Sequence, residues 1–332
     1  MRFLTALCAV GHGRYRLDGI ARMRERPMED LLSALRSLGV KAHSEAGNGC
    51  PPVIVESGGF LRGQGGAVIR GTVSSQFVSA LLMIAPFHEI APLQLILEGS
   101  LVSEPYVKMT EAMLRDWGVI WWNPLNGYEF RSESMAHFGV DEYAIEPDAS
   151  AASYFWAAAA MMDGSVKVQD ITPKSIQGDV SFVALLNRMG CQVIREASGI
   201  TVFGGPVHGI DADMNHISDT VMTLAAVACF AEGPTTIRNV AHIRHKETDR
   251  IAALATELRR IGAGVEESAD GLTITPRPLH GAEIETYNDH RMAMSMALIG
   301  LKVPGIVIKN PGCVAKTYPN FFADLERLRQ VS

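Results

Sequence analysis

The sequence repeats one pattern four times, and this repeat constrains the fold more than any other feature. Each copy is an amphipathic helical segment that stops at a glycine and runs on into an apolar stretch. The four glycines, Gly39, Gly118, Gly190 and Gly262, are 79, 72 and 72 residues apart. One or two such helices are common in α/β proteins, but four at similar spacing indicate repeated units. The segments are residues 31–40, 113–119, 185–191 and 257–263.

A second set of helices, rich in alanine, methionine and serine, is predicted between the members of the first. Such helices have no charged face, so we expect them to be buried on all sides with sheets packed around them. They begin near Met1, Ser74, Asp148, Asp219 and Asp289, and most of the reactive polar residues lie at or just before these starts. A helix N-terminus carries unpaired N–H groups and a partial positive charge. The repeat therefore predicts several helix starts that point at one anionic ligand.

The length and composition are typical of a globular protein with two domains. The chain has 332 residues, of which 47% are hydrophobic and 20% are charged. An extended segment leads into a new helix near residue 145, so the predicted domains are residues 1–145 and 146–332. The net charge of −6 argues against a general nucleic-acid-binding protein. Anions must instead be held by local lysine and arginine side chains.

The sequence gives no sign of a membrane span, a metal site or an oxidising compartment. No apolar run reaches the roughly 18 residues that indicate a membrane span. The apolar residues 1–10 lack a signal-peptide cleavage site, and we interpret them as a helix of the second set. The five cysteines are scattered and have no metal-ligand spacing. We expect a cytoplasmic protein with reduced thiols that needs neither a metal nor another cofactor.

The segment Ser74-Ser75-Gln76 opens one helix of the second set. Two hydroxyls and the unpaired N–H groups of a first helical turn can cradle a phosphate. Serines at this place are more often simple helix caps. The segment alone is therefore a weak signal for phosphate binding.

A charged run, Lys246-Glu247-Thr248-Asp249-Arg250, gives a stronger signal. On a helix Lys246 and Arg250 share one face, with Glu247 beside it. Arg244 precedes the run and brings a third cation to this side. The alternative is a solvated run of charges that pair with one another. The apolar helix that follows favours a partly buried anion site.

Three further positions carry possible chemistry. Asp289 is expected to cap a helix, and His290 and Arg291 in its first turn oppose the helix dipole by about 0.3–1 kcal/mol each. That cost is explained if these side chains hold an anion, and a structural pair of Arg291 with Asp289 is the alternative. Asp219 is expected to cap another helix or to act as a general base. Lys316 follows a strand, where most lysines are solvated.

Together these segments supply cations and backbone donors for at least two anionic groups, and carboxylates for proton transfer. The sequence contains no P-loop, GxGxxG motif or metal-binding spacing. The residues therefore predict an enzyme that joins or transfers groups between phosphorylated or carboxylated small molecules without a metal.

The same motifs resemble the 5-enolpyruvylshikimate-3-phosphate synthase family, in order along the whole chain. The matching segments are Ser74-Ser75-Gln76-Phe77, Asp148-Ala149-Ser150-Ala151-Ala152-Ser153-Tyr154, Asp213-Met214-Asn215-His216-Ile217, Lys246-Glu247-Thr248-Asp249-Arg250, Asn288-Asp289-His290-Arg291-Met292-Ala293 and Ala315-Lys316-Thr317. The resemblance implies an α/β (α+β) fold of two domains, each an inside-out α/β barrel of repeated βαβαββ units that closes on substrates. It also implies transfer of the carboxyvinyl group of phosphoenolpyruvate to the 5-hydroxyl of shikimate 3-phosphate, by addition and then elimination.

The resemblance implies a role for each matching residue. Shikimate 3-phosphate would be bound by Ser74, Ser75, Gln76, Ser103 and Tyr106, and phosphoenolpyruvate by Arg26, Arg250, Arg291 and Lys316. The catalytic residues would be Asp219 near the 5-hydroxyl, Glu247 near the methylene carbon, Lys246 and Lys316. Lys246 would also contact shikimate 3-phosphate, and His242 and His290 would complete the substrate-binding set. Phosphate and carboxylate groups need several such charge-assisted hydrogen bonds.

The sequence departs from the family pattern in three places. Glu104 stands where the family often has lysine, and His242 stands where it often has asparagine. The family's opening unit, with a Lys-Ser…Arg cluster and an Asn-Ala-Gly-Thr segment, does not precede Met1 in this sequence. We therefore expect the first repeat to be missing. The partners would then include an N-terminal complementing fragment, or a second copy that covers apolar surface on the first domain.

Two alternative functions stay open at this point. One is a related enolpyruvyl transferase that acts on a UDP-sugar. The other is a catalytically incompetent fragment or binding subunit that needs an N-terminal partner.

Overall fold

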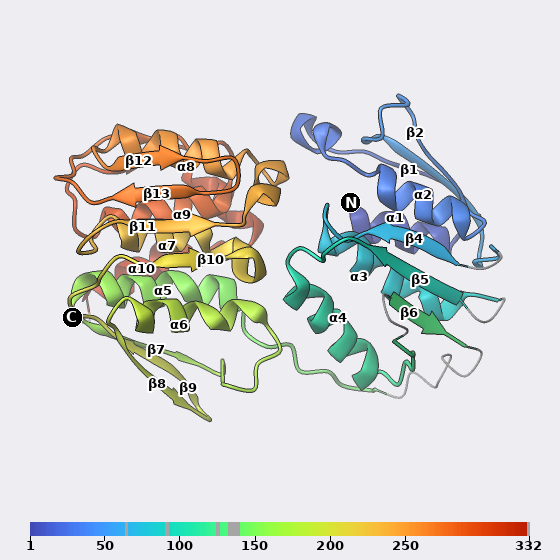
Figure 1. Cartoon of the computed structure of the whole chain (residues 1–332), viewed down its shortest axis with the longest axis horizontal. Coiled ribbons are helices and arrows are strands. Elements are labelled where there is room, and N and C mark those ends of the chain that lie inside the picture. The colour runs from blue at the N-terminus through green and yellow to red at the C-terminus, as the bar shows by residue number, and fades with distance from the viewer. Residues whose placement is uncertain (64–65, 90–92, 124–126, 132–139, 331–332) are drawn as a thin grey trace. The chain divides into compact units, whose positions relative to one another are not determined.

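Two units with separate hydrophobic cores make up the chain, Met1–Ala144 (unit 1) and Ile145–Ser332 (unit 2). The computed structural model describes residues 1–63, 66–89, 93–123, 127–131 and 140–330. Both units mix helices with small sheets (Figure 1), so the predicted α/β fold class is confirmed.

Within its described residues, unit 1 contains two three-stranded sheets. In one sheet, strands in the order β1-β3-β2 pair antiparallel, and in the other β4 pairs parallel with β5 and β5 pairs antiparallel with β6. Helix α3 packs against both α1 and α4. The elements are α1 (Arg2–Ala9), β1 (His12–Leu17), η1 (Ala21–Glu25), α2 (Glu29–Ser37), β2 (Lys41–Ser44), β3 (Val53–Gly58), β4 (Ala67–Arg70), α3 (Ser75–Ile84), η2 (Ala85–Phe87), β5 (Leu93–Glu98), α4 (Glu104–Asp116) and β6 (Gly127–Phe130).

Unit 2 contains three sheets in the described residues, with strand orders β7-β9-β8, β10-β11-β13-β12 and β14-β15. Its first part consists of α5 (Ala149–Met162), β7 (Ser165–Gln169), η4 (Gly178–Ser181), α6 (Phe182–Arg188), β8 (Gln192–Glu196), β9 (Gly199–Phe203), β10 (Asp211–Asp213), η5 (Asn215–Thr220) and α7 (Val221–Ala228). Its second part consists of β11 (Thr235–Arg238), η6 (Ala241–His245), α8 (Arg250–Arg260), β12 (Gly264–Glu267), β13 (Leu272–Thr275), β14 (Glu283–Ile284), α9 (His290–Ile299), β15 (Val307–Ile308), η7 (Pro311–Lys316) and α10 (Phe321–Gln330).

The four predicted amphipathic helices are α2, α4, α6 and α8, and all four end in the same way. The glycine two residues beyond each helix has a positive φ, from 80° at Gly118 to 115° at Gly190. After α8, the N–H of Gly262 donates to the carbonyl of Arg259, and the next N–H donates to Leu258, both at 3.0 Å. The same two bonds recur after the other three helices. This is the Schellman motif, in which a left-handed glycine satisfies the last helical carbonyls.

The small-residue helices of unit 2 lie at the centre of that unit. Helices α5, α7 and α9 pack against one another, and α7 is buried at every position. Alanine, serine and methionine allow this packing because their side chains are small or flexible. Asp148 and Asp289 cap α5 and α9, and in unit 1 Ser74 caps α3, each through a side-chain oxygen that accepts a backbone N–H. The predicted burial in unit 2 and the caps expected at Ser74 and Asp289 are confirmed, and Asp148 is found as a further cap.

Helix α1 differs from the prediction that all such helices are buried on every side. It buries its small residues, Thr5, Ala6 and Ala9, whereas Phe3, Leu4 and Leu7 are 44%, 55% and 60% exposed. The small face of the helix has the packing role, because α1 contacts α3 and strand β3. Its larger side chains lie on the opposite face.

Candidate active site

The centre of the site in unit 2 is the Arg250 guanidinium, which lies at the start of α8 with 2% of its side chain exposed. Its Nε donates to Asp289 Oδ2 at 2.8 Å, and its Nη1 donates to Asp219 Oδ1 at 3.0 Å. Its Nη2 donates to Glu247 Oε2 at 2.8 Å. One buried cation is therefore held by three carboxylates from three separate segments of the chain. Such pairing is required, because an unpaired buried charge is strongly unfavourable.

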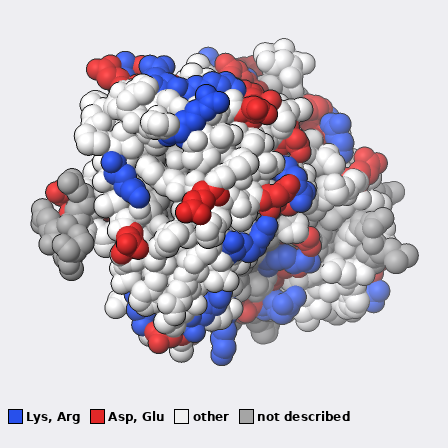
Figure 2. Space-filling model, turned by 60° about the vertical axis from the view of Figure 1, so that its left-hand side comes forward, with Lys and Arg blue, Asp and Glu red and all other residues white. Residues whose placement is uncertain are grey.

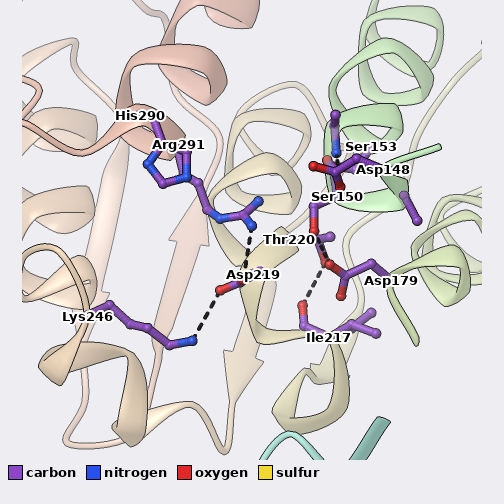
Figure 3. A network of polar contacts seen from close by, with 12 residues as sticks. Asp148, Ser150, Ser153, Asp179, Ile217, Asp219, Thr220, Lys246, His290 and Arg291 are labelled. Carbon is purple, nitrogen blue, oxygen red and sulfur yellow. Dashed lines mark hydrogen bonds and ion pairs between the residues drawn. The ribbon is translucent and has the colours of Figure 1, made fainter. Parts of the chain in front are cut away.

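Two more cations converge on Asp219 (Figure 3). Arg291 Nη2 donates to Asp219 Oδ2 at 2.9 Å, and Lys246 Nζ donates to Oδ1 at 3.4 Å. The other arm of Arg291 reaches the hydroxyl of Tyr154 at 3.5 Å. A fourth cation, Lys316, donates to Glu247 Oε1 at 2.5 Å. Four cations thus surround three carboxylates, which leaves a local excess of one positive charge when all seven groups are ionised.

The charges shift the pKa values of these groups in a consistent way. Burial alone would raise the pKa of Asp219, but Arg291, Lys246 and Arg250 hold that pKa well below its usual range. Burial likewise opposes ionisation of Glu247, yet Arg250 and Lys316 lower its pKa. Burial lowers the pKa of Lys246. Both carboxylates are therefore ionised near neutral pH, and Lys246 gives up its proton more readily than an exposed lysine.

Two histidines beside this cluster stay neutral. Burial, and next the neighbouring Lys246, lowers the pKa of His242 to about 4. Burial, and next Arg291, lowers the pKa of His290 to about 4. His290 Nδ1 lies 3.7 Å from Asp289 Oδ1, which is too far for a hydrogen bond. Neutral imidazoles add hydrogen-bonding groups without adding charge.

A second, smaller network holds the η5 segment that carries Asp219 (Figure 3). The Ser150 hydroxyl donates to the buried carboxylate of Asp179, and the Thr220 hydroxyl donates to the carbonyl of Ile217 at 2.8 Å. Ile217 has a non-helical backbone (φ −129°, ψ 39°), so the chain kinks just before Asp219. Helical turn η4, which contains Asp179, packs against η5. The kink is therefore stabilised by the hydrogen bond of Thr220 and by packing against η4.

Unit 1 gathers a separate polar group at the starts of α1 and α3. Arg2 Nη1 donates to Ser74 Oγ at 3.0 Å and to Gln76 Oε1 at 2.8 Å, and the guanidinium lies 4.8 Å from the centre of the Phe77 ring. Ser75 is buried beside them at the first position of α3. A guanidinium, hydroxyls and a helix N-terminus together suit an anionic group.

The remaining predicted residues of unit 1 lie on other elements. Ser103 is buried in the left-handed conformation (φ 52°) at the residue before α4, and Tyr106 is half-buried in the first turn of α4. Arg26 is half-buried and directly follows η1. Helix α4 packs against α3, so Ser103 and Tyr106 lie at the start of a helix that neighbours the one begun by Ser74 and Ser75.

Two local expectations about unit 2 are wrong. Asp219 does not cap α7, because η5 continues through Thr220, and the carboxylate is turned toward cations from other elements. Lys246 does not share a helical face with Arg250, because it directly follows η6, and α8 begins only at Arg250. Lys246 and Arg250 still both contact Asp219, so the tertiary fold brings together the two cations that were expected to share a helical face.

The placement of Arg244 in the cluster is also wrong. Its guanidinium pairs with Asp249 at 2.9 Å and with Glu267 at 2.9 Å. Asp249 is the N-cap of α8, and Glu267 ends β12. Arg244 therefore ties the start of α8 to the sheet.

Sequence reasoning missed three contributors to these two polar clusters. Arg2 was overlooked although it lies at a predicted helix start, which was the signal to use. Asp289 was expected to cap a helix, with a pair to Arg291 as the alternative, and its carboxylate also holds Arg250. Tyr154 lies in a segment that resembles the family, but no role was predicted for it, because it lies inside an alanine-rich helix and meets Arg291 only through folding.

The charges on the face shown in Figure 2 are mixed, with lysine and arginine side chains interspersed among aspartate and glutamate. Within the described ranges, no group of three or more His, Cys, Asp and Glu residues could hold a metal ion. No helix in the same ranges is long and apolar enough to span a membrane.

Comparison with known proteins decides the family. The model for EPSP synthase (3-phosphoshikimate 1-carboxyvinyltransferase) matches residues 1–325. The chain belongs to the EPSP synthase family. A curated EPSP synthase relative from Nostoc punctiforme, named 3-phosphoshikimate 1-carboxyvinyltransferase, is 50% identical over 97% of this chain and 75% of its own length. One of the same name from Aeromonas salmonicida is 42% identical over 99% of this chain and 77% of its own length.

Solved structures agree with the EPSP synthase assignment. EPSP synthase from Acinetobacter baumannii aligns with a TM-score of 0.75 at 25% identity, over 98% of this chain and 76% of that chain. The enolpyruvyl transferase NikO from Streptomyces tendae shares the fold, with a TM-score of 0.72 at 22% identity over 98% of this chain and 74% of that chain. The predicted membership of this carboxyvinyl transferase family is confirmed.

Proposed function

We propose that this chain transfers the carboxyvinyl group of phosphoenolpyruvate to the 5-hydroxyl of shikimate 3-phosphate and releases inorganic phosphate. The hydroxyl adds to C2 of phosphoenolpyruvate, the methylene carbon gains a proton, and elimination of that proton and of phosphate restores the double bond. The observation that carries the proposal is the partly buried cluster of four cations and three carboxylates in a member of this family. Cations bind both anionic groups of phosphoenolpyruvate, and carboxylates serve proton transfer.

We assign the residues by combining motif and geometry. Arg26, Arg250, Arg291 and Lys316 bind phosphoenolpyruvate, and Ser74, Ser75, Gln76, Ser103 and Tyr106 bind shikimate 3-phosphate. Lys246, Asp219, His242 and His290 complete the substrate-binding set. In domain terms, residues 1–145 bind shikimate 3-phosphate, and residues 146–332 supply most of the phosphoenolpyruvate-binding and catalytic groups. Buried Ser75 and Ser103 support the assignment of hydroxyl donors to a phosphate.

The same charges explain how Asp219 can become a base. Before substrate binds, its depressed pKa makes it a weak proton acceptor. A phosphate or carboxylate that binds Arg291 and Arg250 draws those cations away from Asp219 and so raises the pKa of that carboxyl. Asp219 then accepts the 5-hydroxyl proton, and Glu247 exchanges the methylene proton by the same logic.

The test is release of inorganic phosphate from purified protein with both substrates present. We expect Asp219→Asn to lower kcat by about 10²- to 10⁴-fold, in the range for loss of a general base. Asp148→Asn is the control, because Asp148 caps α5 and has no ion pair with the cluster. A second arm adds the part of the Nostoc punctiforme relative that the match leaves out. Absence of phosphate release in both arms would refute the proposed activity.

The alternatives are separated by the same assay. The names of the curated relatives favour shikimate 3-phosphate over a UDP-sugar, and replacement of one acceptor by the other checks this choice. Activity only in the second arm would identify a subunit that needs a complementing fragment, which stays a prediction. We also propose a cytoplasmic location, because all five cysteines are unpaired, as expected in a reducing compartment.

A further inference from the structure

The turn that leads into α9 has an unfavourable backbone conformation. The N–H of Asp289 donates to the carbonyl of Thr286 at 2.8 Å, which closes a four-residue turn. Its two central residues, Tyr287 and Asn288, both have positive φ, 53° and 55°. Turns of this kind favour glycine, asparagine and aspartate, and a tyrosine in the left-handed region is disfavoured by its Cβ. Such a conformation persists only where surrounding contacts hold it.

The contact that holds the turn comes from a buried carboxylate, Glu257, in the last part of α8. Glu257 is fully buried and accepts the Tyr287 hydroxyl at 2.7 Å. It also accepts the N–H of Glu285 at 3.1 Å and pairs with Arg260 Nε at 3.0 Å. One carboxylate on one helix therefore holds both the entry to the turn and its strained tyrosine.

The same turn is connected to every cation assigned to phosphoenolpyruvate in unit 2. It ends at Asp289, which holds the Arg250 guanidinium and accepts the N–H of Arg291 at 2.9 Å. On its other side it contacts η7, the element that ends at Lys316. Asn310 Nδ2, at the start of η7, donates to Asn288 Oδ1 at 3.3 Å.

A second contact ties the turn to η7. The side chain of Thr286 hydrogen bonds the Cys313 thiol, and Cys313 lies in the middle of η7. Thr286 is itself buried. The turn is thus held between α8, α9 and η7, the three elements that carry Arg250, Arg291 and Lys316.

We propose that Glu257 and Tyr287 are positioning residues, which hold the turn 286–289 and through it orient Arg250, Arg291 and Lys316 as one group. The consequence for function rests on the proposed activity, in which these three cations bind phosphoenolpyruvate. Loosening the turn then weakens phosphoenolpyruvate binding and leaves shikimate 3-phosphate binding unchanged. Neither residue is among those assigned to substrate binding, so we expect the effect to be transmitted through the backbone of the turn.

The test compares Tyr287→Phe with Tyr128→Phe in the full chain. Both variants lose one tyrosine–carboxylate hydrogen bond, since Tyr128 donates to Glu111 at 2.5 Å within unit 1. Tyr287 is 40% exposed, so its variant keeps the core intact. Amide hydrogen exchange of residues 291–293 is measured first, because this readout requires no activity.

In Tyr287→Phe we expect exchange of these amides to rise about tenfold, the effect of one lost charge-assisted hydrogen bond. In Tyr128→Phe it should equal that of the wild type. In the phosphate-release assay the KM for phosphoenolpyruvate should rise about fivefold to tenfold in Tyr287→Phe, with kcat and the KM for shikimate 3-phosphate within about twofold. Glu257→Gln should change both readouts in the same direction.

Unchanged exchange at residues 291–293 in both Tyr287→Phe and Glu257→Gln would overturn the proposal. An equal rise in both KM values would also overturn it, since a general loss of stability affects both substrates. If the wild-type chain releases no phosphate, the proposed function fails. The exchange measurement then still decides, by its rise or its constancy, whether Glu257 and Tyr287 hold the turn.

Discussion

Replacement of Asp289 by asparagine isolates the value of one buried ion pair. Asp289 is fully buried, caps α9 through the N–H of Arg291 at 2.9 Å, and accepts Arg250 Nε at 2.8 Å. Asparagine caps a helix about as well as aspartate, so the cap is kept while the charge is lost. The matched variant Asp148→Asn makes the same change at the cap of α5, where the carboxylate is exposed and accepts the backbone N–H of Ala151 at 3.1 Å.

The structure sets the expected size of the effect. Removal of one partner of a buried ion pair costs about 3–5 kcal/mol. Arg250 keeps its bonds to Asp219 and Glu247, so we take the lower end, about 3 kcal/mol, for Asp289→Asn. In a unit of this size each kcal/mol lowers Tm by about 2–4 °C, which predicts a loss of about 6–12 °C. For Asp148→Asn only the helix-dipole contribution of about 0.3–1 kcal/mol is lost, or about 1–4 °C.

The assay is differential scanning calorimetry of both variants at neutral pH. The transition of unit 2 is identified as the one whose Tm does not change when residues of unit 1 are substituted. The reasoning predicts a clear gap between the two variants, because only Asp289 faces a buried guanidinium. Equal shifts in Tm for Asp289→Asn and Asp148→Asn would refute it. Such a result would mean that Asp219 and Glu247 alone satisfy Arg250.

Three further predictions concern other parts of the fold. Burial lowers the pKa of His290 from 6.5 to about 4, so as the pH falls the imidazole is protonated in the unfolded chain before it is protonated in the folded protein. The free energy of unfolding should therefore fall by up to about 3 kcal/mol between pH 6.5 and pH 4. In denaturant titrations, the free energy of unfolding of His290→Gln should depend less steeply on pH over this range than that of the wild type. An equal pH dependence would contradict the assignment. Tyr128→Phe should cost unit 1 about 1.5–3 kcal/mol in urea unfolding, because its hydroxyl donates to the buried carboxylate of Glu111, and a cost below about 0.5 kcal/mol would argue against that bond. Gly271→Ala should cost about 1–3 kcal/mol, because the new Cβ would lie 1.9 Å from a carbonyl oxygen of β11, whereas Gly205→Ala, which meets nothing within 4 Å, should be neutral.

Helix ends and caps were predictable because their codes are local. A glycine two residues beyond each amphipathic helix takes the left-handed conformation whatever surrounds it, and the same two hydrogen bonds follow in all four copies. The caps at Ser74, Asp148 and Asp289 depend on a side chain and an N–H two or three residues away. Strands β11 and β13 have a similarly local code, since each contains β-branched residues and lies between turn residues.

The pairing of charges was not predictable in the same way. Arg250 lies 31 residues from Asp219 and 39 from Asp289, and Arg291 lies 72 residues from Asp219. Asp219 was expected to cap a helix, but the kink at η5 turns its carboxylate toward Lys246, which follows η6, and toward the arginines that begin α8 and α9. No pattern of neighbouring residues encodes such a meeting. It depends on which elements pack together.

The sequence by itself determined the repeated units, the buried small-residue helices, the family and the set of charged residues available for chemistry. Only the tertiary structure decided how those charges combine. In the folded protein Arg250 pairs with three carboxylates, and Arg244 pairs with Glu267 at the end of β12. Glu257 accepts a hydrogen bond from Tyr287 in the strained turn before α9. The physical reason is the distance along the chain over which each interaction acts. Backbone capping acts over a few residues, whereas a buried charge must find its partners wherever the fold removes it from water.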